Sequence, residues 1–217
     1  MGLSDIAWRS QLRQDRFVAE LLQGKRDGTF VDIGAGDPEQ ISNTVVLERQ
    51  FGWRGLLCDL AHYDALRAHR PTALVLKDAL VPTTRDWADH FLSVERIKEH
   101  EEQAAHPWSW HKMRALTGWI DYLSLDLEPP ELTIEVLLRL PADYRFRVAT
   151  VEHDEYRDEN GPLRKELVRT LMAWRGYLLV AEIGAKDYGP IEDWFIHQES
   201  GITIAHAAKV LREMEIG

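Results

Sequence analysis

The feature that most restricts how this chain can fold is an alternation of short β-rich runs with longer helical patterns. Runs of β-branched and aromatic residues predict seven strands, at residues 29–33, 55–59, 73–77, 122–126, 147–152, 177–183 and 192–197. Helical patterns are found at residues 5–23, 43–49, 63–69, 87–91, 131–140 and 163–174. Strands that alternate with helices are typical of right-handed crossovers between parallel strands, so we expect an α/β fold with a mostly parallel sheet.

The last two predicted strands have a different connection. Only residues 184–191 join them, with Gly189-Pro190 as the turn signal. This segment is too short for a helical crossover and therefore implies an antiparallel pair. We expect one reversed strand, at the edge of the seven-stranded sheet. A chain of 217 residues with 45% hydrophobic residues fits a single domain, residues 1–217.

Residues 94–119 interrupt the alternation between the third and fourth predicted strands. The segment is rich in glutamate, histidine and tryptophan, which predicts a polar insertion over one end of the sheet. Trp108 and Trp110 could face inward as a lid that shields a substrate, or they could pack back onto the sheet. The sequence leaves both arrangements open.

Charge and composition restrict the partners of the chain. Its 36 acidic residues against 26 lysines and arginines give a formal charge of -10, which argues against a nucleic-acid partner. The single cysteine excludes an intrachain disulfide and paired-cysteine zinc sites, and it favours a cytoplasmic setting. The apolar runs are far shorter than the roughly 20 residues that span a bilayer, so no membrane partner is expected. A small-molecule substrate is expected, and a homo-oligomer is left open.

The first predicted strand runs into a glycine turn, VDIGAGD at residues 31–37. In a doubly wound sheet, the backbone amides of this turn can approach a nucleotide-like ligand. A dinucleotide fingerprint would need a third glycine where Glu39 stands, and the carboxylates of Asp32 and Asp37 would repel a phosphate. A ligand with a positive end, such as S-adenosylmethionine, fits this charge pattern.

An aspartate that suits the same ligand also lies at the end of each of the next two predicted strands. Asp59 ends the second strand, where a ribose-binding carboxylate is expected, and Asp78 follows the third, where it could meet an adenine amino group. A single aspartate at a strand end is more often a helix cap, so the evidence lies in the repetition at successive strand ends. The predicted cofactor-binding residues are Asp32, Gly34, Gly36, Asp59 and Asp78.

Short motifs along most of the chain point to one known family. They are SQ at 10–11, QDRFV at 14–18, FVDIGA at 30–35, SNT at 42–44, DYLSLD at 121–126, VEH at 151–153 and DWFI at 193–196. Together they resemble the FkbM-type family of S-adenosylmethionine-dependent methyltransferases. The resemblance implies a Rossmann-like class I methyltransferase fold, with Asp32 and Gly34 facing the methionine portion of the cofactor, Asp59 the ribose and Asp78 the adenine. Departures from the family pattern, among them Pro38 and Pro129-Pro130, point to an altered substrate pocket.

Two strands that should lie side by side end in DLE at residues 126–128 and EHD at residues 152–154. Carboxylates that converge there would repel one another. A divalent cation such as Mg²⁺, Mn²⁺ or Fe²⁺ would relieve the repulsion, since oxygen ligands plus one imidazole suit these ions. The arrangement is also similar to catechol-type O-methyltransferases, which implies Asp126, Glu152 and His153 as the catalytic and metal-ligating residues.

Other interpretations of these residues stay open. Glu152 and His153 could pair with each other or with Arg157, or His153 could act as a general base without a metal. The predicted function is transfer of a methyl group from S-adenosylmethionine to a small molecule, at a hydroxyl. A non-catalytic module that binds the same cofactor, and a metal-dependent hydrolase that uses the acids without it, are the alternative functions.

Overall fold

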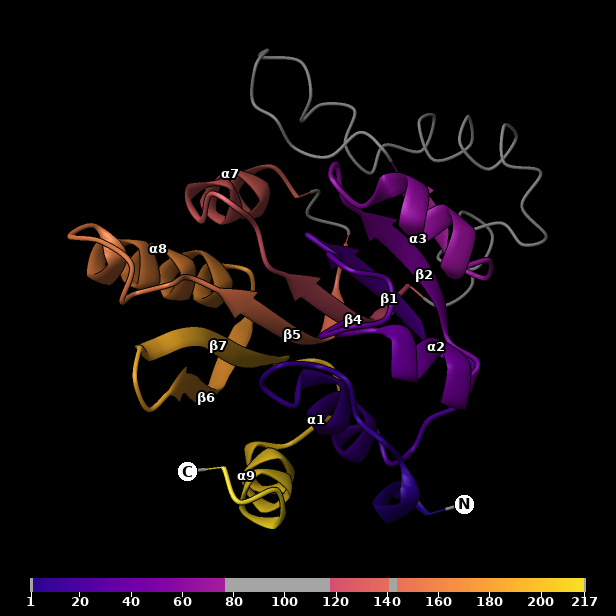
Figure 1. Cartoon of the computed structure of the whole chain (residues 1–217). Coiled ribbons are helices and arrows are strands. Elements are labelled where there is room, and N and C mark those ends of the chain that lie inside the picture. Colours follow the sequence, from indigo (N-terminus) through magenta and orange to yellow (C-terminus); the bar gives the residue numbers. More distant parts are fainter. Residues whose placement is uncertain (1, 77–117, 141–143, 217) are drawn as a thin grey trace.

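The computed structural model describes residues 2–76, 118–140 and 144–216. Within these residues, one seven-stranded sheet has the strand order β3-β2-β1-β4-β5-β7-β6 (Figure 1). The strands are β1 Thr29–Ile33, β2 Arg54–Cys58, β3 Leu74–Leu76, β4 Ile120–Leu125, β5 Phe146–Glu152, β6 Tyr177–Ala185 and β7 Gly189–His197. The predicted α/β class and the predicted strands are confirmed, with boundaries that move by a few residues.

The reversed strand is β7, and its position differs from the prediction. β7 is antiparallel to both β5 and β6, whereas β1, β2, β3, β4 and β5 pair in parallel. The prediction of a reversed strand at the edge is therefore wrong, because β6 forms the edge. Burial explains this order: residues 191–197 of β7 are all buried, whereas much of β6 is exposed or half-buried. A strand whose side chains are buried on both faces gains more from an interior place in the sheet.

Helices cover both faces of the sheet (Figure 1). They are α1 Gln14–Leu21, α2 Val45–Phe51, α3 Tyr63–His69, α7 Glu131–Arg139, α8 Gly161–Trp174 and α9 Ile204–Glu213. Apolar side chains of α1, α2, α3 and α9 share one core cluster, and those of α7 and α8 share the other. Trp194 of β7 is fully buried and stacks on Phe17 of α1, with ring centroids 4.3 Å apart.

The N-terminal helix is shorter than predicted. A short 3₁₀ helix, η1, spans Leu3–Asp5, and α1 begins only at Gln14. The Asp15 carboxylate accepts hydrogen bonds from the backbone N–H groups of Arg9, at 2.7 Å, and Ser10, at 3.2 Å. These bonds fold residues 9–13 back as a loop, so they do not continue the helix. The prediction also missed α9, whose Ala207, Val210 and Leu211 are buried against the sheet.

Several predictions fall outside the described residues. They concern Asp78, the helix at residues 87–91, and residues 94–117 of the insertion with Trp108 and Trp110. In the parts of the chain that are described, no helix combines the length and the apolar character needed to cross a membrane.

Candidate active site

The glycine turn after β1 brings three strand ends together. Gly34 has φ +82°, and its N–H donates a hydrogen bond of 2.8 Å to the carbonyl oxygen of Cys58, the last residue of β2. A Cβ atom added at Gly34 would lie 1.5 Å from the carbonyl oxygen of Asp126, which follows β4. Only glycine fits here, because both the left-handed backbone and the contact with Asp126 exclude a side chain.

Gly36 and Asp59, predicted from separate strands, are in direct contact. The Gly36 N–H donates to Asp59 Oδ2 at 2.9 Å, and the His62 N–H donates to Asp59 Oδ1 at 2.7 Å. These two bonds fix the orientation of the Asp59 carboxylate. The His62 Nδ1 atom also lies 3.3 Å from Asp59 Oδ1. Asp59 Oδ2 has one hydrogen bond from the described residues and retains capacity for a ribose hydroxyl, whereas a second hydroxyl at Oδ1 would compete with the His62 ring.

Asp32 lies in β1 with 1% of its surface exposed. Its Oδ2 accepts a hydrogen bond from Thr44 Oγ1 at 2.7 Å, whereas its Oδ1 has no donor among the described residues. Burial raises the pKa of Asp32 to about 6, although its interactions with Thr44 and Ser124 and the charge of Arg70 act in the opposite direction. A buried acceptor without a donor costs about 1–3 kcal/mol, which a donor group of a ligand would recover.

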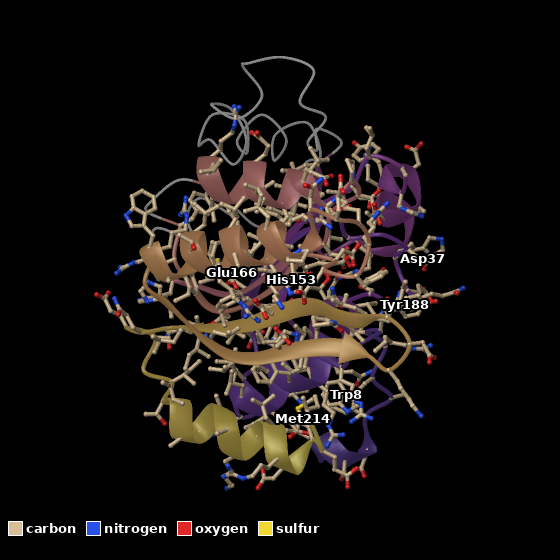
Figure 2. All side chains as sticks on the ribbon, turned by 90° about the vertical axis from the view of Figure 1, so that its left-hand side faces the viewer. Trp8, Asp37, His153, Glu166, Tyr188 and Met214 are labelled. Atoms are coloured by element: carbon tan, nitrogen blue, oxygen red, sulfur yellow. The ribbon has the colours of Figure 1, made fainter. Side chains whose placement is uncertain are left out.

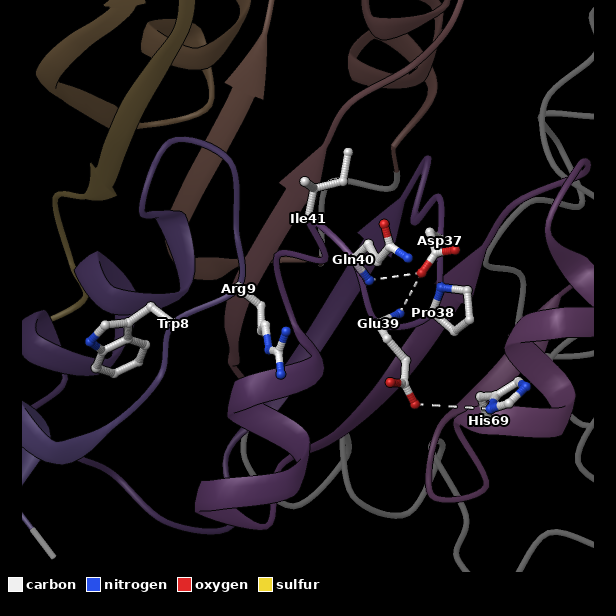
Figure 3. Close-up of a pocket in the computed structure, with 8 residues that line it drawn as sticks. All are labelled: Trp8, Arg9, Asp37, Pro38, Glu39, Gln40, Ile41 and His69. Carbon is white, nitrogen blue, oxygen red and sulfur yellow. Dashed lines mark hydrogen bonds and ion pairs between the residues drawn. The ribbon is translucent and has the colours of Figure 1, made fainter.

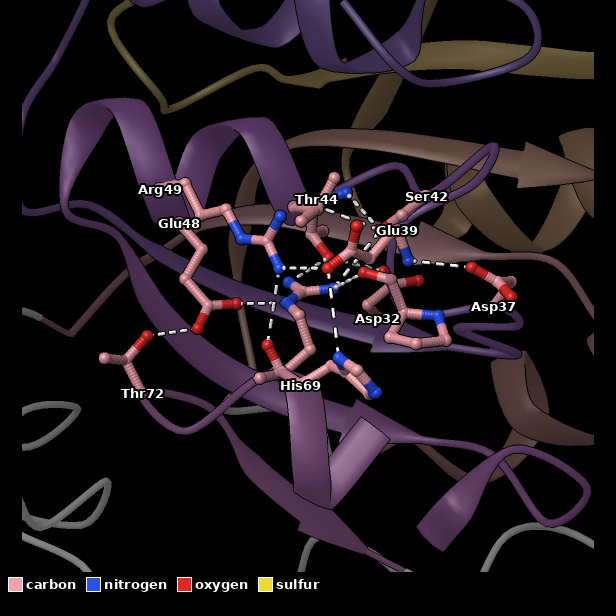
Figure 4. A network of polar contacts seen from close by, with 12 residues as sticks. Asp32, Asp37, Glu39, Ser42, Thr44, Glu48, Arg49, His69 and Thr72 are labelled. Atoms are coloured by element: carbon pink, nitrogen blue, oxygen red, sulfur yellow. Dashed lines mark hydrogen bonds and ion pairs between the residues drawn. The ribbon is translucent and has the colours of Figure 1, made fainter. Parts of the chain in front are cut away.

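A buried arginine contacts the residues that surround Asp32, and Figure 4 labels Ser42, Thr44 and Glu48 of this network. Arg70 follows α3, its side chain is fully buried, and it forms an ion pair with Glu48. Its guanidinium also donates to Ser42 Oγ at 3.2 Å and to Thr44 Oγ1 at 3.1 Å. The chain Arg70–Thr44–Asp32 therefore connects α3 to the end of β1. Arg70 was not among the predicted site residues, because it lies too far along the chain from Asp32 for any local pattern to connect the two.

A groove of about 700 Å³ lies beside the glycine turn (Figure 3). Its lining residues are Trp8, Arg9, Asp37, Pro38, Glu39, Gln40, Ile41 and His69. Asp37 accepts hydrogen bonds from the backbone N–H groups of Gln40, at 2.7 Å, and Glu39, at 2.9 Å, and these bonds lower its pKa. Asp37 therefore stabilises its own loop. Its carboxylate accepts hydrogen bonds from this loop, although the sequence had suggested that it would face a ligand.

Three acids lie on neighbouring strands at the other side of the turn. Asp126 follows β4, Glu152 ends β5, and Glu192 is the direct cross-strand partner of Glu152 in β7. Since Leu125 pairs with Val151, Asp126 and Glu152 come next in the register of β4 and β5. Burial and the proximity of the carboxylates raise the pKa of both Asp126 and Glu152. Burial raises that of Glu192 to about 8.

Asp154 joins this cluster and Glu128 does not. Asp154 is 2% exposed, it interacts with the Glu152 carboxyl group, and its Oδ1 has no donor among the described residues. Arg157 lies 3.4 Å from Asp154 Oδ2 and forms an ion pair with the exposed Glu128. The suggested pairing of Glu152 with Arg157 is therefore replaced by pairs that Arg157 makes with Asp154 and Glu128.

His153 lies apart from the acids. The His153 side chain, labelled in Figure 2, is fully buried. Its Nε2 lies 3.7 Å from Asp193 Oδ1, which is too far for a hydrogen bond. Asp193 in turn accepts hydrogen bonds of 2.6 and 2.8 Å from Arg169 of α8. Adjacent residues of a strand point to opposite faces, so His153 faces the α8 side while Glu152 faces the α1 side.

The predicted metal site is corrected by this geometry. The described part of the chain has no group of three or more histidine, cysteine, aspartate or glutamate side chains arranged to hold a metal ion. Asp126, Glu152 and His153 are not such a set, because the imidazole lies on the other face of the sheet. The structure does bring Asp126 and Glu152 together, and their catalytic role stays a prediction.

Comparison with known proteins gives a fold and no family. No protein-family model matches the chain and no curated protein sequence matches it, so the resemblance to the FkbM-type family is not confirmed. The chain is similar to the crystal structure of a Clostridium thermocellum protein described as an rRNA methylase, with 13% identity and a TM-score of 0.52 over 88% of this chain and 97% of that one. A weaker likeness, with a TM-score of 0.44 and 14% identity, covers 85% of this chain and 66% of a METTL16 methyltransferase domain. The fold is thus Rossmann-like and shared with a protein described as a methylase.

Proposed function

We propose that this protein is an S-adenosylmethionine-dependent methyltransferase. The observation that carries the proposal is the contact between Gly36 and Asp59, which presents a fixed carboxylate at the carboxyl ends of β1 and β2. Ligands bind at this edge of open α/β sheets, and an acid at the end of the second strand suits a ribose. The fold shared with a protein described as an rRNA methylase, and the sequence resemblance to the FkbM-type family, support the same cofactor.

The described residues fit the cofactor. Asp59 would hold the ribose, and the backbone of Gly34 and Gly36 with the buried Asp32 would face the methionine portion. Asp78, predicted for the adenine, lies outside the described residues. When bound, S-adenosylmethionine supplies an electrophilic methyl group on a positively charged sulfonium, and the surrounding carboxylates favour that charge.

The acceptor end of the site is assigned to Asp126 and Glu152. Asp126 lies directly against the glycine turn, since its carbonyl oxygen contacts Gly34 and its N–H donates to the Ile33 carbonyl at 2.9 Å. Both side chains are partly exposed, so an acceptor can reach them. A carboxylate at this position can take the proton that an acceptor loses, from a hydroxyl as the sequence predicts or from a nitrogen.

The alternative functions are less well supported. A hydrolase that uses the acids through a metal lacks the three-ligand group it needs among the described residues. A non-catalytic module would have no use for two partly exposed acids with raised pKa values beside the cofactor turn. A small-molecule acceptor stays our proposal, because a formal charge of -10 disfavours an RNA substrate.

Calorimetric titration with S-adenosylhomocysteine tests the proposal. We expect Asp59→Asn to weaken binding by about 1–3 kcal/mol, because the ribose hydroxyls lose a charged acceptor. Asp64→Asn is the matched control, since Asp64 is an exposed acid of α3 only five positions further along. Equal affinity of Asp59→Asn and the unchanged protein, with both folded, would remove the ribose assignment.

A further inference from the structure

Among the described residues, the acids at the ends of β4 and β5 have almost no positive partner. Asp126 and Glu152 make no ion pair with any described residue, and Asp154 has only Arg157, 3.4 Å from its Oδ2. Arg157 also binds Glu128, so its charge is shared. This concentration of negative charge would be relieved by a cation from outside the described structure.

Hydrogen bonding within this group of acids is also incomplete. Both Asp126 and Asp154 interact with the Glu152 carboxyl group, whose pKa is raised by burial and by its acidic neighbours. One carboxylic acid proton can be donated to one partner at a time, so the other partner lacks a donor. Asp154 Oδ1, in a residue that is 2% exposed, has no hydrogen-bond partner in the described part of the chain. A ligand with several N–H groups would satisfy it.

We propose that Asp126, Glu152 and Asp154 bind the positively charged amine of the methyl acceptor, so that the reaction is N-methylation. This inference rests on the proposed function and names its substrate class. It replaces the hydroxyl acceptor expected from the sequence.

Methylation of a hydroxyl and methylation of an amine differ in the charge that the acceptor carries during the reaction. A hydroxyl acceptor develops negative charge as it loses its proton, and neighbouring carboxylates oppose that charge unless a cation offsets it. The described acids do not form a metal site that could supply one. An amine passes instead from ammonium to neutral amine to methylated ammonium, so the carboxylates favour the bound substrate and the product.

The step balances in atoms and charge. The acceptor ammonium gives one N–H proton to the Asp126 carboxylate and becomes a neutral amine. The nitrogen lone pair then forms a bond to the methyl carbon while the carbon–sulfur bond breaks and its electron pair stays on sulfur. Sulfonium and amine become thioether and methylated ammonium, and Asp126 releases its proton to water.

The cofactor carries an alkylammonium of its own, on its amino-acid portion, so the test must separate two sources of the same chemistry. We choose n-butylamine as the probe and n-butanol as its neutral match, both titrated into protein saturated with S-adenosylhomocysteine. We expect butylamine to bind more tightly by about tenfold or more, a difference of about 1.4 kcal/mol. In the double variant Asp126→Asn, Glu152→Gln this preference should disappear.

Each other outcome has a defined meaning. Butylamine that binds no better than butanol, or not at all, overturns the inference, while retained binding of S-adenosylhomocysteine leaves the proposed function standing. If the double variant loses affinity for S-adenosylhomocysteine but keeps it for methylthioadenosine, which lacks the amino-acid portion, the acids bind the cofactor's ammonium and the acceptor assignment is overturned. A single variant, Asp154→Asn, with an unchanged unfolding midpoint serves if the double variant does not fold; it should lower the preference for butylamine.

Discussion

Replacement of Gly34 by alanine is the sharpest structural prediction, because a second glycine of the same turn provides its control. Gly34 and Gly36 both have left-handed backbones, with φ +82° and +60°. They differ in their surroundings. An added Cβ at Gly34 would lie 1.5 Å from the Asp126 carbonyl oxygen, whereas at Gly36 no atom of the other described residues, its two chain neighbours aside, lies within 4 Å. The two substitutions therefore share the backbone strain, and only Gly34→Ala adds a clash.

The expected magnitudes follow from these two terms. An alanine in the left-handed region costs roughly 1–2 kcal/mol, which is the whole effect expected for Gly36→Ala. At Gly34 the clashing atom belongs to the backbone at the end of β4, so β1 and β4 must move apart where the Asp126 N–H bonds to Ile33. We expect a total loss of about 4 kcal/mol or more, in the range that strained or overpacked core sites reach.

Urea unfolding of the unchanged protein and of both variants measures this difference. We expect the Gly34→Ala midpoint to fall well below that of Gly36→Ala, with similar slopes if both unfold in two states. Two variants that lose the same free energy of unfolding would show that β1 and β4 do not approach as closely as described, and the argument would be refuted.

Three further predictions concern the buried polar groups. Because the pKa of Asp32 is raised to about 6, affinity for S-adenosylmethionine should rise as the pH increases through 6 and then level off, and Asp32→Asn should abolish this dependence; calorimetry between pH 5 and pH 8 measures it. The stability of the ligand-free protein should change with pH in the opposite direction. Ionised Asp32 lowers the free energy of unfolding above about pH 6, and this loss disappears as the pH falls towards 3.8. Asp32→Asn should therefore raise the free energy of unfolding at pH 7 by up to about 3 kcal/mol. Arg70→Met should lose about 3–5 kcal/mol in urea unfolding because Glu48 is left buried and unpaired, and Glu48→Gln in the same chain should recover part of it; a loss below 1 kcal/mol would count against the network.

The strands could be predicted because their signals are local. β1 to β5 are short apolar runs, of which β1, β2, β4 and β5 end at or just before a glycine or an acid, and the helices between the strands require parallel connections. The place of β7 could not be predicted in the same way. The order of β6 and β7 depends on which of the two strands gains more free energy from burial between neighbouring strands. This gain is determined by side chains from distant parts of the chain.

Only the part of the candidate site that has local sequence signals could be predicted. Gly36 and Asp59 follow from their positions at strand ends, and the structure brings them into contact. His153 was placed with the acids although alternation along β5 already sends it to the face opposite Glu152. Arg70 had no local signal, because its partners Ser42 and Thr44 lie more than one crossover away.

A direct comparison of two ligands tests the central claim, that the turn after β1 accepts a cofactor with a positive end and not a pyrophosphate. Calorimetric titration of the unchanged protein with S-adenosylmethionine and, separately, with NAD⁺ makes the comparison. The account predicts saturable binding of S-adenosylmethionine at one site and no measurable binding of NAD⁺, because the acids of the turn and of the neighbouring strand ends repel phosphate. Binding of NAD⁺ without binding of S-adenosylmethionine would contradict it.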